Sequence, residues 1–287
     1  MAFVSEKTKT NLHLSKLTFS ADILVPPACP VCHQAQAEDD GLCPRCWQGL
    51  EFIRKPICAV SGMPMAVDLG DEAVCLPVQI HPPPYAKARA AFAYKGSAAA
   101  LVKRLKFGDR PELAAFLARF MIAAGRDVLT PDAVLVPVPL HRRRLILRRF
   151  NQAAELCRAI QNITDHEIFY QSVARIKPTR QQIGLTRAGR NRNLAGAFAV
   201  PEKARAHING RTLVLVDDVL TTGATVEALA KLLLRAGAGQ VHVLTLARVV
   251  MAEQVTIVGP RRHDEHRRAK QGESGMRAND QRAQSGG

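Results

Sequence analysis

Residues 213–225 combine an apolar run with the side chains best suited to chemistry in this chain. Leu213–Val216 lead directly into Asp217 and Asp218, and a hydroxyl-rich segment follows: Thr221, Thr222, Gly223, Ala224 and Thr225. Buried strands of parallel sheets have such apolar runs, and ligands bind where those strands end. Two carboxylates suit the vicinal hydroxyls of a ribose, and amides at a helix start favour a phosphate. The pattern predicts a ribose-5-phosphate site, whereas an ordinary strand-to-helix turn would need only one acid.

Four of the seven cysteines form two CxxC pairs with ten residues between them: Cys29, Cys32, Cys43 and Cys46. Each pair makes a tight turn that presents two thiolates, and two such turns complete a tetrahedron. The spacing predicts a structural zinc ion, with disulfides or redox-active pairs as the alternatives. Cys58 and Cys75 stand alone, because Ser61 and Val78 occupy the positions where CxxC partners would fall. A second complete site is therefore not expected.

The net charge of +15 is concentrated between residues 141 and 200, where twelve Arg or Lys face three acidic residues. Such a field favours a polyanion, either a polyphosphate, a nucleotide or a nucleic acid, although any single side chain could belong to a solvated surface. Two stretches in this region suit pyrophosphate, one after a predicted strand end and one in a polar flap. The candidates are Val138, Arg142, Arg143, Arg144, Arg175, Lys177 and Gln181.

The elements that must position these residues alternate between strand and helix from Tyr85 onward. Apolar periodicity predicts strands at 88–94, 133–136, 166–173, 213–216 and 241–246, and helices at 98–106, 111–124, 151–160 and from the 221–225 segment to Gly237. Strand, helix and strand joined by short links form a right-handed parallel unit. The expected fold class is α/β, with helices flanking a parallel sheet.

Composition divides the chain into four parts. These are a polar N-terminal tail (1–22), a small metal-stapled module (23–80), the α/β domain (81–250) and a disordered C-terminal tail (251–287). No internal repeat of useful length is found. The chain has no run of eighteen apolar residues and no secretory signal, so we expect a cytoplasmic location.

Taken together, these features resemble the ComF family. The matching stretches are the four paired cysteines with 42–47, Pro137–Pro139 with 149–153, Thr179 and Gln181, 190–198 and 216–225. The resemblance implies an N-terminal zinc ribbon on a type I phosphoribosyltransferase-like domain, linked to natural competence and DNA uptake. It also implies that Asp217, Asp218 and the 221–225 loop bind 5-phosphoribosyl 1-pyrophosphate (PRPP) together with Mg²⁺.

The sequence departs from the family pattern at informative positions. Relatives often have four cysteines in a second knuckle pair, and the usual Arg-Gly-Phe-Asn-Gln has Arg149 in place of its glycine here. Thr221 stands where purine salvage enzymes with a similar motif carry an aspartate base, which argues against hypoxanthine or guanine as acceptor.

Three hypotheses for function are left open. The chain is a phosphoribosyltransferase with an unknown acceptor, a non-catalytic PRPP or nucleotide sensor, or a competence factor that binds single-stranded DNA. Aromatic residues make up only 5% of the chain, few for base stacking. Contacts with the competence machinery and a homo-oligomer also stay open.

Overall fold

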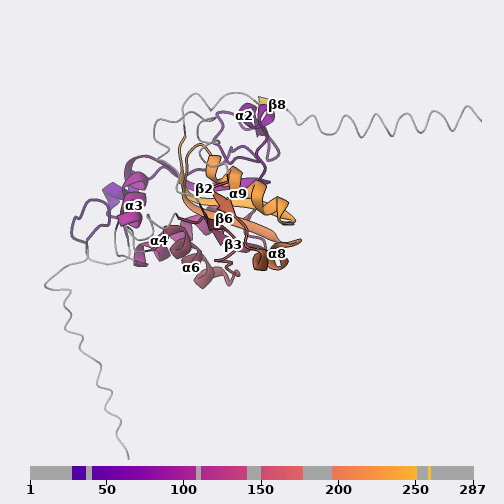
Figure 1. Ribbon diagram of the computed structural model, residues 1–287. Helices are drawn as coiled ribbons and strands as arrows, with labels where there is room; N and C mark the ends of the chain where they lie inside the picture. Colours follow the sequence, from indigo (N-terminus) through magenta and orange to yellow (C-terminus); the bar gives the residue numbers. More distant parts are fainter. Residues whose placement is uncertain are drawn as a thin grey trace, which may run out of the picture.

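A four-stranded parallel sheet forms the centre of the molecule (Figure 1). The computed structural model describes residues 28–36, 41–107, 111–140, 150–176, 196–250 and 258–259. The strand order is β2 (Lys87–Ala93), β7 (Gln240–Arg248), β6 (Thr212–Leu220) and β3 (Val134–Pro137), and all three pairings are parallel. The predicted α/β fold class is confirmed.

Helices cover both faces of this sheet. Val214 and Val216 of β6 lie in the hydrophobic cluster that contains α3 (Gly96–Phe107), α4 (Pro111–Ala124) and α6 (Gln152–Thr164). Leu213 and Leu215 alternate to the other cluster, with α8 (Glu202–Ile208) and α9 (Ala224–Arg235). Because successive strand residues point to opposite faces, an uninterrupted apolar strand is stable only when it is covered on both sides.

Two predicted strands differ from the structure. Residues 166–173 do not form a strand; Ile168 makes a single parallel bridge to Leu135, and the short strand β4 (Ala174–Arg175) follows, paired with β5 (Phe198–Ala199). Strand β6 is longer than the apolar run, because its backbone stays in register with β7 as far as the Leu220–Arg248 pair. The two acids therefore lie inside β6, before its last two residues.

The N-terminal part consists of two cysteine modules. The first cysteine module (28–36 and 41–49) ends with α1 (Pro44–Gln48), and the second (57–81) contains β1 (Val74–Cys75) and α2 (Leu76–Ile80). The linker between them pairs with the edge of the sheet, since Phe52 bridges Phe92 in β2. The N-terminal part is thus joined directly to the sheet.

The predicted tails lie almost entirely outside the described residues. All of 1–22 does so, and within 251–287 only β8 (Val258–Gly259) is described, paired antiparallel with β1. The predicted domain boundaries stay predictions. Among the helices of the described residues, none has the length and apolar character needed to cross a bilayer.

Candidate functional site

The acid pair of β6 is connected to a lysine from a different element. Asp218 is 9% exposed, and its Oδ2 lies 2.9 Å from Nζ of Lys106 near the end of α3. The backbone amide of Asp218 donates a hydrogen bond of 2.8 Å to Oδ1 of Asp217. The two neighbouring carboxylates of β6 and the ammonium group of Lys106 from α3 thus form a polar cluster, and β6 leads into α9.

The electrostatics of this cluster favour a ligand that donates hydrogen bonds. Burial, followed by repulsion from Asp218, raises the pKa of Asp217 to about 7, while the charges of Lys106 and Arg175 act in the opposite direction. Asp217 therefore titrates near neutral pH. Hydroxyl groups or cations brought to the pair would favour its ionised form.

Lys106 is a site residue that sequence reasoning missed. It sits at the end of an amphipathic helix close to Lys103 and Arg104, and nothing in that pattern separates it from solvated neighbours. Its position is supported by Gln152, whose Nε2 donates a hydrogen bond of 3.3 Å to the Lys106 carbonyl oxygen. Only the packing of α3 against α6 and β6 brings its charge to the acids.

The loop after β6 leads to the first residue of α9, and this helix start lies in the segment for which the sequence predicted one. Gly223 is the N-cap residue, with φ of 81° in the left-handed region that glycine tolerates, and no side chain caps the helix. Thr221 and Thr222 are exposed beside it. A helix N-terminus without a capping side chain leaves amide donors for an anion.

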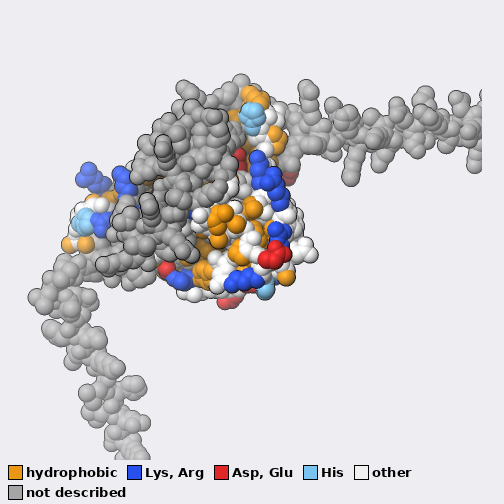
Figure 2. Space-filling view, in the orientation of Figure 1, with side chains coloured by type: hydrophobic (Ala, Val, Ile, Leu, Met, Phe, Trp, Pro, Cys, Tyr) orange, Lys and Arg blue, Asp and Glu red, His pale blue; other side chains and the backbone are white. Residues whose placement is uncertain are grey.

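The pyrophosphate and flap candidates are only partly described. Val138 follows β3 and is 5% exposed, and its amide donates a 2.9 Å hydrogen bond to Val216, so the end of β3 lies beside the acid strand. Arg175 lies in β4, where its guanidinium stands 5.4 Å from the centre of the Phe198 ring and its charge lowers the pKa of Asp217. The candidates outside the described residues are Arg142, Arg143, Arg144, Lys177 and Gln181. On the face in Figure 2, the described Lys and Arg side chains lie at separate places rather than in one patch.

The four paired cysteines come together as predicted. The Sγ atoms of Cys29, Cys32, Cys43 and Cys46 all lie within 4.8 Å of one another. The sulfurs of Cys32 and Cys43 are 3.6 Å apart, close to the separation of about 3.8 Å that a tetrahedral zinc–thiolate site with bonds of about 2.3 Å requires. The donor set fits structural zinc and leaves no open coordination position.

Cys58 and Cys75 of the second cysteine module form a partial copy of that arrangement. The Cys58 sulfur accepts hydrogen bonds from the amides of Ser61 (3.4 Å) and Cys75 (3.3 Å). Hydrogen bonding from the Cys75 side chain is the largest cause that lowers the Cys58 pKa to about 5, and the pKa of Cys75 is raised in turn. In the part of the chain that the structure describes, only the first module brings three or more potential metal ligands together.

Comparison with known proteins identifies the two parts of the chain. Residues 20–79 match the double zinc ribbon domain, and residues 161–263 match the phosphoribosyl transferase domain. The DNA utilization protein YhgH of Salmonella typhimurium is 33% identical over 235 residues, which cover 79% of this chain and 100% of that protein. Competence protein F of Haemophilus influenzae is 34% identical over 154 residues, or 52% of this chain and 66% of that protein. The chain belongs to the ComF family.

Solved structures add little to this ComF-family assignment. The allosteric regulatory enzyme of purine biosynthesis aligns with 16% identity and a TM-score of 0.33, over 50% of this chain and 30% of that one. The family match and the sheet described above establish a zinc ribbon followed by a phosphoribosyltransferase-type domain.

Proposed function

We propose that this ComF-family protein binds PRPP and transfers its phosphoribosyl group to a nitrogen acceptor. The observation that carries the proposal is the Asp217–Asp218 pair, held beside Lys106 and followed directly by the Gly223-capped start of α9. A pair of acids and a set of helix-start amides match the two ends of ribose 5-phosphate in charge. The domain match supports this ligand class.

Each group has a distinct role in this proposal. The ribose hydroxyls donate to Asp217 and Asp218, and the 5-phosphate accepts hydrogen bonds from the amides of 221–225. The hydroxyls replace Lys106 as partners of Asp218, so that the ammonium group is available to the pyrophosphate leaving from the β3 side near Val138. As pyrophosphate departs, positive charge grows on C1, and the nearby carboxylates stabilise it.

Two metal ions complete the proposal. Mg²⁺ prefers carboxylate and phosphate oxygens, which the acid pair and the ligand supply, and it neutralises pyrophosphate charge when bound. Zinc is held by the four cysteines of the first module and serves structure alone, because four thiolates saturate it. We place this activity in the cytoplasm.

The test is the double substitution Asp217→Asn with Asp218→Asn. We expect PRPP affinity, measured by calorimetry with Mg²⁺, to fall about a hundredfold. The reason is that the substitutions weaken two hydrogen bonds to charged acceptors, and each such bond contributes about 1.5 kcal/mol or more to the binding free energy. Asp132→Asn is the matched control, since Asp132 is exposed in the turn before β3. Unchanged PRPP affinity in a folded double variant would reject the ribose site. Release of pyrophosphate with an acceptor present separates an enzyme from a sensor.

Binding of single-stranded DNA is a second candidate function. The net charge of +15 supports it, as do the names of the relatives, DNA utilization protein and competence protein. The same double variant tests whether this activity is separate. We expect its DNA affinity to be kept and to fall with salt by a slope of about −0.7 per phosphate contact. Joint loss of PRPP and DNA binding would place both ligands on the acid site.

A further inference from the structure

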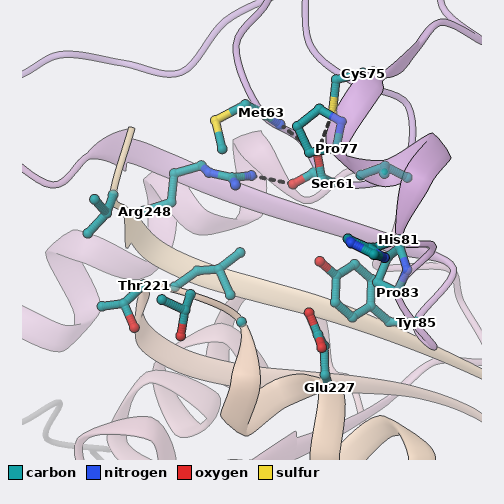
Figure 3. Close-up of a pocket in the computed structure, with 15 residues that line it drawn as sticks. Ser61, Met63, Cys75, Pro77, His81, Pro83, Tyr85, Thr221, Glu227 and Arg248 are labelled. Carbon is teal, nitrogen blue, oxygen red and sulfur yellow. Dashed lines mark hydrogen bonds between the residues drawn. The ribbon is translucent and has the colours of Figure 1, made fainter. Parts of the chain in front are cut away.

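A cavity of about 380 Å³ lies between the second cysteine module and the loop that follows β6 (Figure 3). The module contributes Met63, Cys75 and Pro77 to its lining, and the loop contributes Thr221–Gly223. The cavity therefore touches the proposed phosphate loop from the side of β7. Its volume is at the lower end for ligand pockets and suits a single substituted ring rather than a nucleotide.

One wall of this cavity carries a buried arginine that forms no ion pair with a carboxylate of the described residues. Arg248, at the end of β7, is 5% exposed and donates a hydrogen bond to the carbonyl oxygen of Ser61. Its Nε has no hydrogen-bond partner, and none of the ion pairs among the described residues includes it. A buried cation in this state is costly unless an anion arrives.

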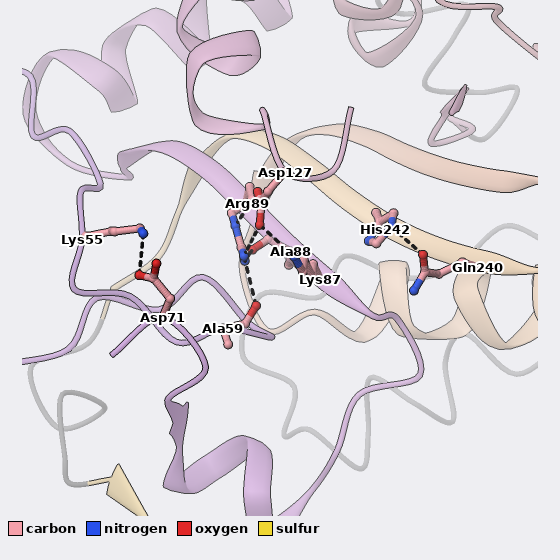
Figure 4. Close-up of polar contacts among 9 residues, drawn as sticks. All are labelled: Lys55, Ala59, Asp71, Lys87, Ala88, Arg89, Asp127, Gln240 and His242. Carbon is pink, nitrogen blue, oxygen red and sulfur yellow. Dashed lines mark hydrogen bonds and ion pairs between the residues drawn. The ribbon is translucent and has the colours of Figure 1, made fainter. Parts of the chain in front are cut away.

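Arg89 shows how this protein otherwise treats a buried arginine (Figure 4). Arg89 is 8% exposed and makes two hydrogen bonds to Asp127, of 3.0 and 2.5 Å. Two more reach the carbonyl oxygens of Ala88 and Ala59. Its charge and its donors are thus satisfied within the fold, whereas Arg248 has no ion pair among the described residues and its Nε has no hydrogen-bond partner.

The groups around Arg248 do not replace an anionic partner. Burial raises the pKa of Tyr85 to about 12 and the pKa of Cys75 is also raised, so both are neutral at pH 7. The Cys58 thiolate is already engaged by two backbone amides. Figure 3 shows Tyr85 and Glu227 on the side of the cavity that faces Arg248. The cavity therefore has a cation on one wall and a carboxylate on the other.

We propose that this cavity receives the phosphoribosyl acceptor, and that the acceptor is a single-ring nitrogen compound with an anionic group, a carboxylate, which Arg248 binds. The proposal rests on the proposed function. In the sheet order, β6 stands between β3 and β7, so the cavity lies across the acid strand from the side assigned to pyrophosphate. Entering and leaving groups occupy opposite sides of C1 in a displacement. Where the acceptor nitrogen carries an N–H group, Glu227 accepts a hydrogen bond from it.

The reaction then balances without a further reagent. The lone pair of the acceptor nitrogen forms a bond to C1 of PRPP while the bond from C1 to the pyrophosphate oxygen breaks. Pyrophosphate leaves with that electron pair. A nitrogen that carries an N–H group loses its proton to solvent, whereas a pyridine nitrogen has no proton to lose and becomes a pyridinium cation. The products are the N-phosphoribosyl compound and pyrophosphate, together with a proton when the acceptor nitrogen carried one.

Matched probe pairs that differ only in the anionic group test the proposal. The probes are 2-aminobenzoate against 2-aminobenzamide, and pyridine-3-carboxylate against pyridine-3-carboxamide, each titrated into the full chain with and without PRPP. We expect each acid to bind about tenfold tighter than its amide, as one charge-assisted hydrogen bond implies. The methyl signal of Met63 should shift on binding, and that of Met121, buried in the core away from this cavity, should not.

Variants assign the preference to one side chain. Arg248→Gln should remove the preference for the acid and leave PRPP affinity within about twofold, while Arg126→Gln, an exposed arginine in a different cavity, should change neither. If the Gln variant does not fold, Arg248→Lys replaces it, because lysine keeps the positive charge. We expect the Lys variant to show a weakened preference for the acid.

Several results would overturn the proposal. The proposal is rejected if the wild-type chain binds acid and amide equally, or if it binds neither; neither result needs a variant. A loss of PRPP affinity in Arg248→Gln would assign the arginine to the phosphate site instead. Absence of PRPP binding together with a clear acid preference would reject the proposed function and the role as acceptor, and would leave a carboxylate-binding cavity.

Discussion

In both cysteine modules the first cysteine begins the same backbone turn. The amide of Cys29 donates to Gln34 and its carbonyl accepts from His33; the amide of Cys58 donates to Met63 and its carbonyl accepts from Gly62. His33 and Gly62 have φ of 64° and 65°. In both modules the later cysteine, Cys43 or Cys75, is the N-cap of a five-residue helix. The two modules are structural repeats.

The modules differ in what holds the repeated backbone together. The first packs around its cysteines, with Val31 and Leu42 as the apolar neighbours. In the second, Ser61 and Val78 stand where the first has Cys32 and Cys46, and the module instead has a buried cluster. Its members are Cys58, Ala59, Met63, Met65, Ala73, Val74 and Cys75. A small module can be stabilised by a metal ion or by a hydrophobic core. The first module has the metal-ligand set, and the second has the hydrophobic core.

The largest expected effect is loss of the metal from the first module. Cys43→Ser should reduce zinc from about one ion per chain to nearly none, because a structural site depends on all four thiolates and metal binding supplies the folding energy. Cys75→Ser, the matched change in the second module, should leave zinc content unchanged. Elemental analysis of protein prepared in reductant without chelators gives the answer. Equal loss from both variants would mean that the modules share one metal site.

A second experiment rebuilds the missing half of the second module. Ser61→Cys with Val78→Cys should raise zinc content from about one to about two ions per chain, because the backbone turns of a four-cysteine site are already present. The Ser61 amide already donates to the Cys58 sulfur, and the Val78 amide makes the same kind of bond to Cys75, whose pKa is nevertheless raised, mainly by the side-chain hydrogen bond with Cys58. The single Ser61→Cys variant is the control and should bind the second ion more weakly. Zinc content that stays at one would show that the second backbone is not an equivalent scaffold.

The smallest expected effect concerns Cys58, the cysteine of the second module whose pKa is lowered. Cys58→Ala should destabilise the protein by about 1–3 kcal/mol, because two backbone amides lose their acceptor. The pKa of Cys58 is lowered to about 5 in the folded protein, below about 8.5 for an unfolded cysteine. Its contribution is therefore fully present above the unfolded pKa and is lost as pH falls toward 5. Urea unfolding should show a larger difference between wild type and variant near pH 8 than near pH 6. A difference that does not depend on pH would mean that Cys58 is protonated in the folded state.

The sequence alone determined features that depend on near neighbours along the chain. The spacing of the CxxC pairs predicted the thiol cluster, since two residues between cysteines suffice for a tight turn. The apolar run before Asp217 predicted the central strand, and the 221–225 segment predicted the helix start that the structure shows. Each of these signals is read from a few consecutive residues, which is why no tertiary information was needed.

Only the tertiary structure decided which distant residues meet. Lys106 reaches Asp218 because α3 packs against the sheet face to which Val214 and Val216 of β6 point. Arg248 contacts Ser61, which is 187 positions away in the sequence. The repeat of the two modules was also not visible in the sequence, because the second module contains only two cysteines. The length of β6 depended on its register with β7. Contacts of this kind follow from strand order and packing, to which every element contributes, so no local pattern of residues encodes them.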